Sequence, residues 1–319
     1  MTHILKVRNV NQAFVEGMWW LKVAGLRETS RNGTVVVAPG PVLTEYSHPT
    51  ERILWHPKRD ANPVFHLLES LWMLAGRNDV ATLLPFNANM GNYAEPDGYI
   101  HGAYGRRWRG HFLVDQLYAI IQMLERDKDS RRAVLAMWDA NVDLAADKRD
   151  LPCNTHAYFD LRDGVLNMTV CCRSNDMVWG AYGANAVHFS ILQEVLAHAL
   201  GAPVGVYRQF SNNFHIYINN PQARELFDTI EATPAPDPDL APTPLILPGE
   251  TFQQFMRDCQ RMWTHPDERK ETVFFRKVVM PLHAVYLARK AGRPWALETT
   301  PVTEWSEAFQ QWAYRRDCK

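Results

Sequence analysis

The strongest constraint on the fold comes from two alternating segments joined by a two-residue turn. Residues 156–162 alternate in type, and the segment VLNMTVCC at 165–172 alternates again. The residues of the second segment that share one face are Leu166, Met168, Val170 and Cys172. Between the segments stands Asp163-Gly164, a dipeptide that favours the tight turns of β-hairpins because both residues tolerate positive φ. The sequence therefore predicts a β-hairpin with one buried face.

A helical pattern precedes this hairpin. Asn62 and Pro63 suit the N-cap and the first position of a helix, and apolar residues repeat at helical spacing until Gly76. These apolar residues are Phe65, Leu68, Leu71, Trp72 and Ala75. A buried helix is expected there.

Further helical and strand-like segments alternate without a regular order. A second helical stripe precedes the strand-like AVLAMW at 133–138, and a third, over 187–196, precedes the strand-like GVYRQF at 205–210. The second stripe consists of Val114, Leu117, Tyr118, Ile121 and Leu124. This irregular interleaving favours an α+β fold class.

The chain has 319 residues, of which 46% are hydrophobic and 22% charged, as in ordinary globular proteins. An α/β core of this length can be continuous, so we expect one domain over residues 1–319. Prolines in ATPAPDPDLAPTPLILPGE, residues 232–250, block helices and sheet ladders and predict a surface loop. Residues 251–319 form a separate C-terminal segment of this domain.

The net charge and the cysteine content limit the cellular compartments and the binding partners that we expect. The formal net charge is -1, so no global basic field attracts nucleic acid polymers or anionic membranes. No segment approaches the length of a membrane span, and the first residues carry no export pattern. The cysteine count of 5 is odd and lacks metal-ligand spacing, so we expect a reduced, cytoplasmic protein without a metal.

Cys153 is the candidate nucleophile. It lies in Leu-Pro-Cys-Asn, directly before the predicted hairpin, where Pro152 restricts the backbone and the sulfur can project from the edge of a sheet. A buried structural cysteine is the competing interpretation. A reactive thiolate needs positive charge nearby, and Arg131, Arg132 and Arg173 are candidates if the fold brings them together.

Other polar residues suit the recognition of a nucleotide. Arg131-Arg132 and Arg173-Ser174 carry donors that match a phosphate monoester, although surface ion pairs explain isolated arginines equally well. Glu69 lies within an apolar helical face, where burial raises the proton affinity of a carboxylate. It is either a proton relay or a structural acid.

Three further residues each have one functional and one structural interpretation. His215 and Tyr217, two positions apart in an extended segment, point to the same side and offer polar tips to a sugar, or they form a packed aromatic pair. The amide of Asn185 carries the donor and acceptor needed at a pyrimidine edge, and N-capping of a helix is its alternative role.

Six segments, taken together and in order, resemble the thymidylate synthase family: ESLWMLAG, GAYGRRWR, DSRRAVLAMW, LPCN, RSNDMVWGAYGAN and NNFHIY. The resemblance covers residues 60–220. It implies a thymidylate synthase-like α+β fold, with a large twisted mixed β-sheet covered by helices and two chains packed sheet to sheet as a homodimer. It also implies a pyrimidine nucleoside monophosphate as substrate and 5,10-methylenetetrahydrofolate as co-substrate.

On this resemblance Cys153 is the nucleophile that adds to C6 of the pyrimidine, so that C5 attacks the one-carbon donor. The implied phosphate ligands are Arg31, Arg131, Arg132, Arg173 and Ser174. Arg131 and Arg132 are implied to cross the dimer interface. Arg31, in SRNGT, matches the mobile phosphate-loop arginine only in part.

The resemblance assigns the remaining site residues as well. Glu69 matches the carboxylate that organises a proton-relay water, Tyr104 an active-site tyrosine and Asp176 an acid that contacts folate. Asn185 matches the residue that recognises the base, and the residues that match the sugar ligands are His215 and Tyr217.

Three departures from the family pattern bear on the product. Asn154 replaces the histidine usual after the nucleophile, Met90 falls near an expected tryptophan, and the short apolar C-terminal closure is absent. In the family that tryptophan and closure shield the exocyclic methylene formed at C5. Their loss is expected to admit water, which favours a hydroxymethylase.

The competing functions are a thymidylate synthase that makes dTMP and dihydrofolate, with Trp305 or Trp312 as a substitute lid, and a non-catalytic nucleotide- or RNA-binding homologue. A cysteine hydrolase is remote, because no His-Asn pair has matching context. Asn185 favours dUMP, since cytosine-specific members carry aspartate at that position. The loop before it is one residue longer than usual, so dCMP and CMP stay open.

Overall fold

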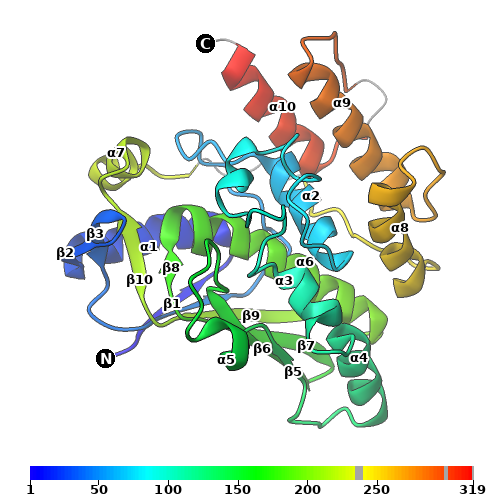
Figure 1. The fold of residues 1–319 in the computed structure, drawn as a ribbon, viewed down its shortest axis with the longest axis horizontal. Helices are drawn as coiled ribbons and strands as arrows, with labels where there is room; N and C mark the ends of the chain where they lie inside the picture. Colours follow the sequence, from blue (N-terminus) through cyan, green and yellow to red (C-terminus); the bar gives the residue numbers. More distant parts are fainter. Residues whose placement is uncertain (234–239, 298–300, 318–319) are drawn as a thin grey trace.

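The computed structural model describes residues 1–233, 240–297 and 301–317. Within these residues the strands form two sheets (Figure 1). The larger sheet has the order β1 (His3–Val7), β4 (Val42–Tyr46), β9 (Val204–Ser211), β7 (Val165–Cys172), β6 (Asn154–Arg162), β5 (Val134–Ala136). The smaller sheet has the order β2 (Leu26–Ser30), β3 (Gly33–Val37), β10 (Phe214–Tyr217), β8 (Asn175–Asp176).

The predicted hairpin is confirmed at the centre of the large sheet. Strands β6 and β7 pair antiparallel, and Arg162 opposite Val165 closes the turn. Asp163 and Gly164 have φ of 53° and 76°, the positive values that this turn requires. The face predicted to be buried is buried along its whole length: Leu166, Met168, Val170 and Cys172.

The large sheet is mixed, as expected. β1 runs parallel to β4 and β7 parallel to β9, whereas β4 and β9 are antiparallel. The chain passes from β7 into β8 and from β9 into β10, so two strands of the large sheet are each followed in sequence by a strand of the smaller sheet. In the smaller sheet this places His215 opposite Asp176 in parallel register.

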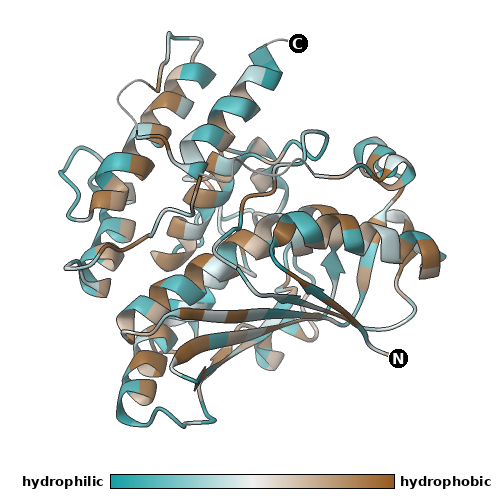
Figure 2. Cartoon of the chain, turned by 180° about the vertical axis from the view of Figure 1, so that it is seen from behind, coloured by the Kyte–Doolittle hydropathy of each residue, from teal (hydrophilic) through white to brown (hydrophobic). Residues whose placement is uncertain are grey.

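Helices fill the space above the large sheet, and α1 and α6 lie directly over it in both views (Figures 1 and 2). Figure 2 shows long hydrophobic stretches in the strands and in the helices above them. The helical elements are α1 (Val10–Ala24), α2 (Pro63–Leu74), η1 (Ala88–Asn92), α3 (Tyr104–Arg106), η2 (Arg107–His111), α4 (Gln116–Arg126), α5 (Ala140–Asp143), η3 (Met177–Asn185), α6 (Ala186–Ala199), α7 (Pro221–Thr229), α8 (Phe252–Thr264), η4 (Phe275–Val279), α9 (Met280–Lys290) and α10 (Glu304–Asp317).

Helix α2 is the predicted buried helix. Its N-cap is Asn62, whose side chain accepts a hydrogen bond from the backbone of Phe65 at 3.0 Å, and Pro63 follows at the first position. α2 packs against α6, α8 and α10. The second predicted helix, α4, begins at Gln116, so the assignment of Val114 to its buried stripe was wrong, since that side chain is exposed.

The C-terminal segment folds back onto the core, where α9 and α10 lie beside α2 (Figure 1). Part of the Pro-rich segment, residues 234–239, lies outside the described residues. Its remainder forms neither helix nor strand, as predicted, and is fixed in part by the backbone of Thr243, which donates to Glu304 at 2.9 Å. None of the described helices is long and apolar enough to cross a membrane.

Candidate active site

A cavity of about 790 Å³ lies between α2, the segment 86–104, the start of α6 and the C-terminal helices. Four residues of the candidate site line it: Glu69, Met90, Tyr104 and Asn185. Its volume falls within the range of small-molecule sites. The cavity is therefore a candidate site for a bound ligand, although Cys153 itself does not line it.

Tyr104 links this cavity to Cys153. Its hydroxyl oxygen accepts hydrogen bonds from the backbone of Cys153 at 3.1 Å and of Asn154 at 3.0 Å. The short helix α3 can bring Tyr104 there because Gly105 packs against the backbone of Met73 on α2, where any side chain would collide. Close packing between α3 and α2 thus positions the candidate nucleophile.

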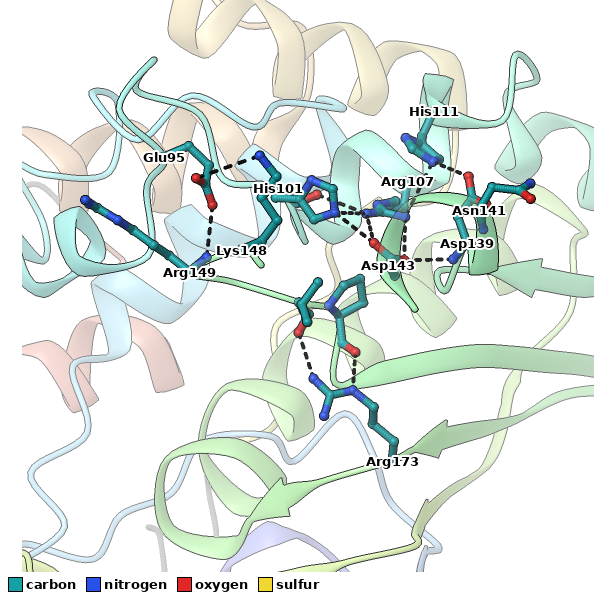
Figure 3. A network of polar contacts seen from close by, with 12 residues as sticks. Glu95, His101, Arg107, His111, Asp139, Asn141, Asp143, Lys148, Arg149 and Arg173 are labelled. Carbon is teal, nitrogen blue, oxygen red and sulfur yellow. Dashed lines mark hydrogen bonds and ion pairs between the residues drawn. The ribbon is translucent and has the colours of Figure 1, made fainter. Parts of the chain in front are cut away.

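Arg173 lies beside the sulfur of Cys153, as the nucleophile hypothesis requires. Its Nη2 is 3.8 Å from Sγ, and its guanidinium donates to the carbonyls of Pro152 at 2.9 Å and Leu151 at 3.2 Å (Figure 3). Burial raises the pKa of the Cys153 thiol, whereas the positive charge of Arg173 lowers it. In this chain burial outweighs the arginine.

Two other charged groups also act on this thiol. Asp150, three residues earlier and in the cavity wall, raises the pKa of Cys153, and Arg31 lowers it. Arg31 lies in the turn between β2 and β3. Burial raises the pKa of Asp150 itself to about 6. The role of Asp150 was not anticipated from the sequence, where it is one acid in a charged run.

Asn185 belongs to a chain of amide side chains. Its Oδ1 accepts from Nδ2 of Asn154 at 3.0 Å, and its Nδ2 donates to Oδ1 of Asn175 at 3.1 Å. Asn175 donates in turn to Ser211 at 2.9 Å. Asn185 stands at the N-terminus of α6 but makes no side-chain capping bond, so the capping interpretation was wrong. The amides of Asn154 and Asn175 therefore fix the orientation of the Asn185 amide, which lines the cavity.

Glu69 lies in the cavity wall opposite α6. Its Oε2 is 3.0 Å from Nε2 of His188, and both side chains are largely buried. The distance is that of an ion pair, but the angle is not that of a hydrogen bond, since Nε2 has no hydrogen-bond partner among the described residues. The carboxylate in the apolar face is therefore paired with a histidine that sequence analysis did not single out.

The smaller sheet carries three more candidates, Asp176, His215 and Tyr217, none of which lines the cavity. Oδ1 of Asp176 accepts the backbone N–H groups of Val178 at 2.9 Å and Trp179 at 2.7 Å, and Trp179 lines the cavity. The rings of His215 and Tyr217 meet edge to face with centroids 4.9 Å apart, so the packed aromatic pair is present.

One oxygen of Asp176 is unsatisfied. Its Oδ2 is buried and has no hydrogen-bond partner in the described part of the chain. Burial raises the pKa of Asp176 to about 6, against the effect of the backbone donors of Trp179, Val178 and Tyr217 and of the charge of Arg59. Such a group has an acceptor, or a proton when neutral, to offer to a bound molecule.

Arg131 and Arg132 do not converge with Cys153 within one chain. Both are exposed in the turn before β5, and no contact joins them to Cys153 in the described ranges. Ser174 follows Arg173, and its backbone carbonyl accepts the thiol of Cys172 at 3.1 Å. The condition that the fold brings Arg131 and Arg132 to the thiol is therefore not met within one chain, and their donation across an interface stays a prediction.

A buried ionic network supports the segment that leads to Cys153 (Figure 3). Arg107 donates to both carboxylate oxygens of Asp143 at 2.8 Å and 2.9 Å, and His101 contacts the same carboxylate at 2.8 Å. Further along, the backbone of Arg149 donates to Glu95 at 2.9 Å. These partners are far apart in sequence, which is why pattern analysis did not find the network.

The C-terminal helices complete the cavity wall with Trp312, considered from the sequence as a lid, and with residues of α9 and α10 that were not predicted: Tyr286, Arg289, Lys290 and Arg316. Trp312 stacks on Tyr286 with ring centroids 5.8 Å apart, and the guanidinium groups of Arg289 and Arg316 both lie over its ring. The condition set for a substitute lid is met in part, because Trp312 reaches the cavity whereas Trp305 does not line it.

No group of three or more His, Cys, Asp or Glu side chains suited to a metal ion occurs within residues 1–233, 240–297 and 301–317. The four cysteines described, Cys153, Cys171, Cys172 and Cys259, are free thiols. Cys318 lies outside the described residues.

Comparison with known proteins gives the family. The chain is 44% identical to the deoxyuridylate hydroxymethyltransferase of Pseudomonas phage M6, over 98% of this chain and 94% of the relative. It is 37% identical to that of Bacillus phage SP01, over 56% of this chain and 50% of the relative. It is 29% identical to that of Delftia phage PhiW-14, over 67% and 62%. The family model for thymidylate synthase matches residues 26–256, and the chain therefore belongs to the thymidylate synthase family.

Proposed function

We propose that the protein transfers a one-carbon unit from 5,10-methylenetetrahydrofolate to C5 of dUMP and releases the 5-hydroxymethyl nucleotide. The observation that carries this proposal is the position of Cys153, whose backbone is held at 3.1 Å by the cavity residue Tyr104. The relative that matches nearly the whole chain is named deoxyuridylate hydroxymethyltransferase, which supports dUMP and the hydroxymethyl product.

The reaction begins with Cys153 as nucleophile. Its thiolate adds to C6 of the uracil ring, and the electron pair of the C5–C6 double bond makes C5 nucleophilic. The charge of Arg173, 3.8 Å from Sγ, favours the thiolate. Tyr104 keeps the backbone of Cys153 in place during attack, so the sulfur is positioned without a further change of conformation.

Recognition of the base falls to Asn185. Its amide carries a donor and an acceptor, the pattern that a uracil edge complements, and Asn154 and Asn175 fix which atom faces which way. The proposed sugar ligands are His215 and Tyr217, and the proposed phosphate ligands are Arg31, Arg173, Ser174 and, from a second chain, Arg131 and Arg132.

The cavity suits a folate as co-substrate, which supplies the methylene carbon. Its wall carries the aromatic side chains of Trp179, Tyr93 and Trp312, on which a flat pterin can stack. Asp176 accepts the backbone N–H of Trp179 at 2.7 Å, and its Oδ2, which has no hydrogen-bond partner among the described residues, is an acceptor that matches the amino groups of such a ring. We propose that Asp176 and Met90 contact the folate.

Water has to reach the methylene for a hydroxymethyl product. Met90 is partly buried and stands in the wall near the position where the family carries a tryptophan, so a flexible thioether replaces a rigid shield. Trp312 also lines the wall, which is the observation that favours the second candidate, a thymidylate synthase. The names of the relatives favour hydroxymethylation.

We further propose a cytoplasmic homodimer of single-domain chains packed sheet to sheet. α1 and α6 cover one face of the large sheet (Figure 1), while Ile4 and Tyr158 on its strands are 51% and 44% exposed. Exposed apolar side chains on an open sheet face suit burial against a second copy. A dimer formed there is the arrangement that would let Arg131 and Arg132 serve the partner's site.

Product analysis tests the function. Incubation with dUMP and methylenetetrahydrofolate should yield hydroxymethyl-dUMP and tetrahydrofolate, identified by mass. Thymidylate with dihydrofolate would instead establish the second candidate, and inertness with dUMP, dCMP and CMP would establish a non-catalytic homologue. Cys153→Ala should be inert, whereas Cys171→Ala, a matched change at another partly buried thiol, should keep activity.

A further inference from the structure

The pairing of Glu69 with His188 has no part in the reaction described so far. Glu69 lies on α2 and His188 in the first turn of α6, and both line the cavity. Their side chains are only 13% and 5% exposed, with Oε2 and Nε2 3.0 Å apart. A carboxylate and an imidazole in contact at a cavity wall form a proton-accepting unit.

We propose that His188 is a positioning residue for the hydration step, acting through Glu69. The pair accepts the proton of the water molecule that adds to the exocyclic methylene. This inference rests on the proposed function, since it concerns the step that produces the hydroxymethyl group.

The location of His188 follows from the helix geometry. His188 lies three residues after Asn185, so the two side chains lie on neighbouring positions of the same helical face, and both reach the cavity. Asn185 is the proposed ligand of the base. Glu69 lies on α2, which packs against α6, so its contact with His188 lies in the cavity wall near the residue proposed to hold the pyrimidine.

The surroundings leave the pair free to act on a water. His66, one helical turn before Glu69, meets the ring of His188 edge on with centroids 6.3 Å apart. Burial, with the charge of Arg59, holds the pKa of His66 well below its ordinary value, so His66 is neutral. His188 is therefore the histidine that meets the carboxylate, and Nε2 has no hydrogen-bond partner among the described residues.

The step balances without another reactant. The water oxygen forms a bond to the methylene carbon, and the electron pair of the methylene–C5 double bond shifts to form the C5–C6 double bond. The C6–Sγ bond breaks, and Cys153 leaves as the thiolate. One water proton passes to the pair of Glu69 and His188, which later returns it to solvent. Nothing is oxidised or reduced.

Two measurements on one variant test the assignment. Tritium placed at C5 of dUMP is released when the methylene forms, before water adds, so tritium release reports folding, binding and attack by Cys153. Hydroxymethyl-dUMP reports hydration. In a single turnover of His188→Ala, with enzyme in excess over nucleotide, we expect hydroxymethyl formation to fall about 10²-fold, while tritium release falls far less. An added small thiol should then capture the accumulated methylene as a thioether.

Two further variants make the result specific. His188→Gln keeps a donor that can contact Glu69, so it should recover most of the hydration rate. His198→Ala changes a histidine on the same helix, outside the cavity wall, and should keep both rates.

If tritium release and hydroxymethyl formation fell by the same factor in His188→Ala, His188 would have no specific role in hydration. If the wild-type protein released tritium but formed no hydroxymethyl-dUMP, the proposed function itself would be wrong, and the two failures are thus distinguishable.

Discussion

The hydroxyl oxygen of Tyr104 lies 3.1 Å from the backbone nitrogen of Cys153 and accepts its hydrogen bond. The same oxygen accepts the backbone and the side-chain amide of Asn154, both at 3.0 Å. One cavity side chain therefore holds the start of β6 and the first member of the amide chain that leads to Asn185. The nucleophile and the proposed ligand of the base are coupled through this phenol.

Tyr104→Phe should lower both the stability of the fold and the rate of the reaction. Removing the oxygen leaves buried N–H groups of Cys153 and Asn154 without an acceptor, which should lower the unfolding free energy by about 2–3 kcal/mol. Displacement of the sulfur should lower kcat by about 10²-fold. Urea unfolding and product formation measure the two effects, and Tyr99→Phe, at a half-exposed side chain, is the control. Unchanged kcat would show that the phenol does not position Cys153.

The charges around Cys153 predict opposite shifts in two variants. Arg173→Gln removes the positive charge that lowers the pKa of the thiol, so the pKa should rise. Asp150→Asn removes a negative charge that raises it, so the pKa should fall. The pH dependence of alkylation, assigned to Cys153 by comparison with Cys153→Ser, measures both. Shifts in the same direction would contradict this electrostatic account.

Local patterns were sufficient for the fold elements and for the residues next to the motifs. The Asp163-Gly164 turn and the Asn62 cap depend on neighbouring residues alone, and both are confirmed. The contact between Glu69 and His188 depends on how two helices pack, so it left no pattern in either segment. Arg173 lies 20 residues from Cys153, yet the hairpin predicted between them explains why they meet.

Apart from Trp312, which was considered as a lid, the C-terminal wall was beyond sequence analysis for a different reason. Trp312 and Arg316 reach the cavity because α10 folds back across α2, over a distance that no local pattern encodes. This segment also lies outside residues 26–256, the part matched by the family model. The resemblance to the thymidylate synthase family therefore could not predict where α10 lies.

Asp176 should make stability depend on pH. Burial raises its pKa from 3.8 to about 6, so the folded state binds this proton more tightly than the unfolded state. The resulting stability is present at low pH and is lost as pH rises through about 6, up to about 3 kcal/mol. Asp176→Asn keeps the shape and cannot ionise. Urea unfolding between about pH 4 and pH 7.5 should therefore show a smaller decline in this variant, and equal declines would contradict the raised pKa.

Asn185→Asp should change the preferred base. The carboxylate accepts from the amino group of cytosine, whereas it repels the carbonyl oxygen of uracil that an amide N–H can bind. The ratio of kcat/KM for dCMP to that for dUMP should rise by about 10²-fold. Both nucleotides are assayed on the same variant, so a general loss of folding cancels in the ratio. An unchanged ratio would remove Asn185 from base recognition.

The covalent bond between Cys153 and the nucleotide is the central claim, and mass spectrometry tests it most directly. A dUMP carrying fluorine at C5 cannot lose that atom as it loses a proton, so the adduct with the folate carbon should accumulate. The account predicts one nucleotide per chain on the peptide that contains Cys153, and none in Cys153→Ser. An adduct on another cysteine, or none at all in an active protein, would contradict it.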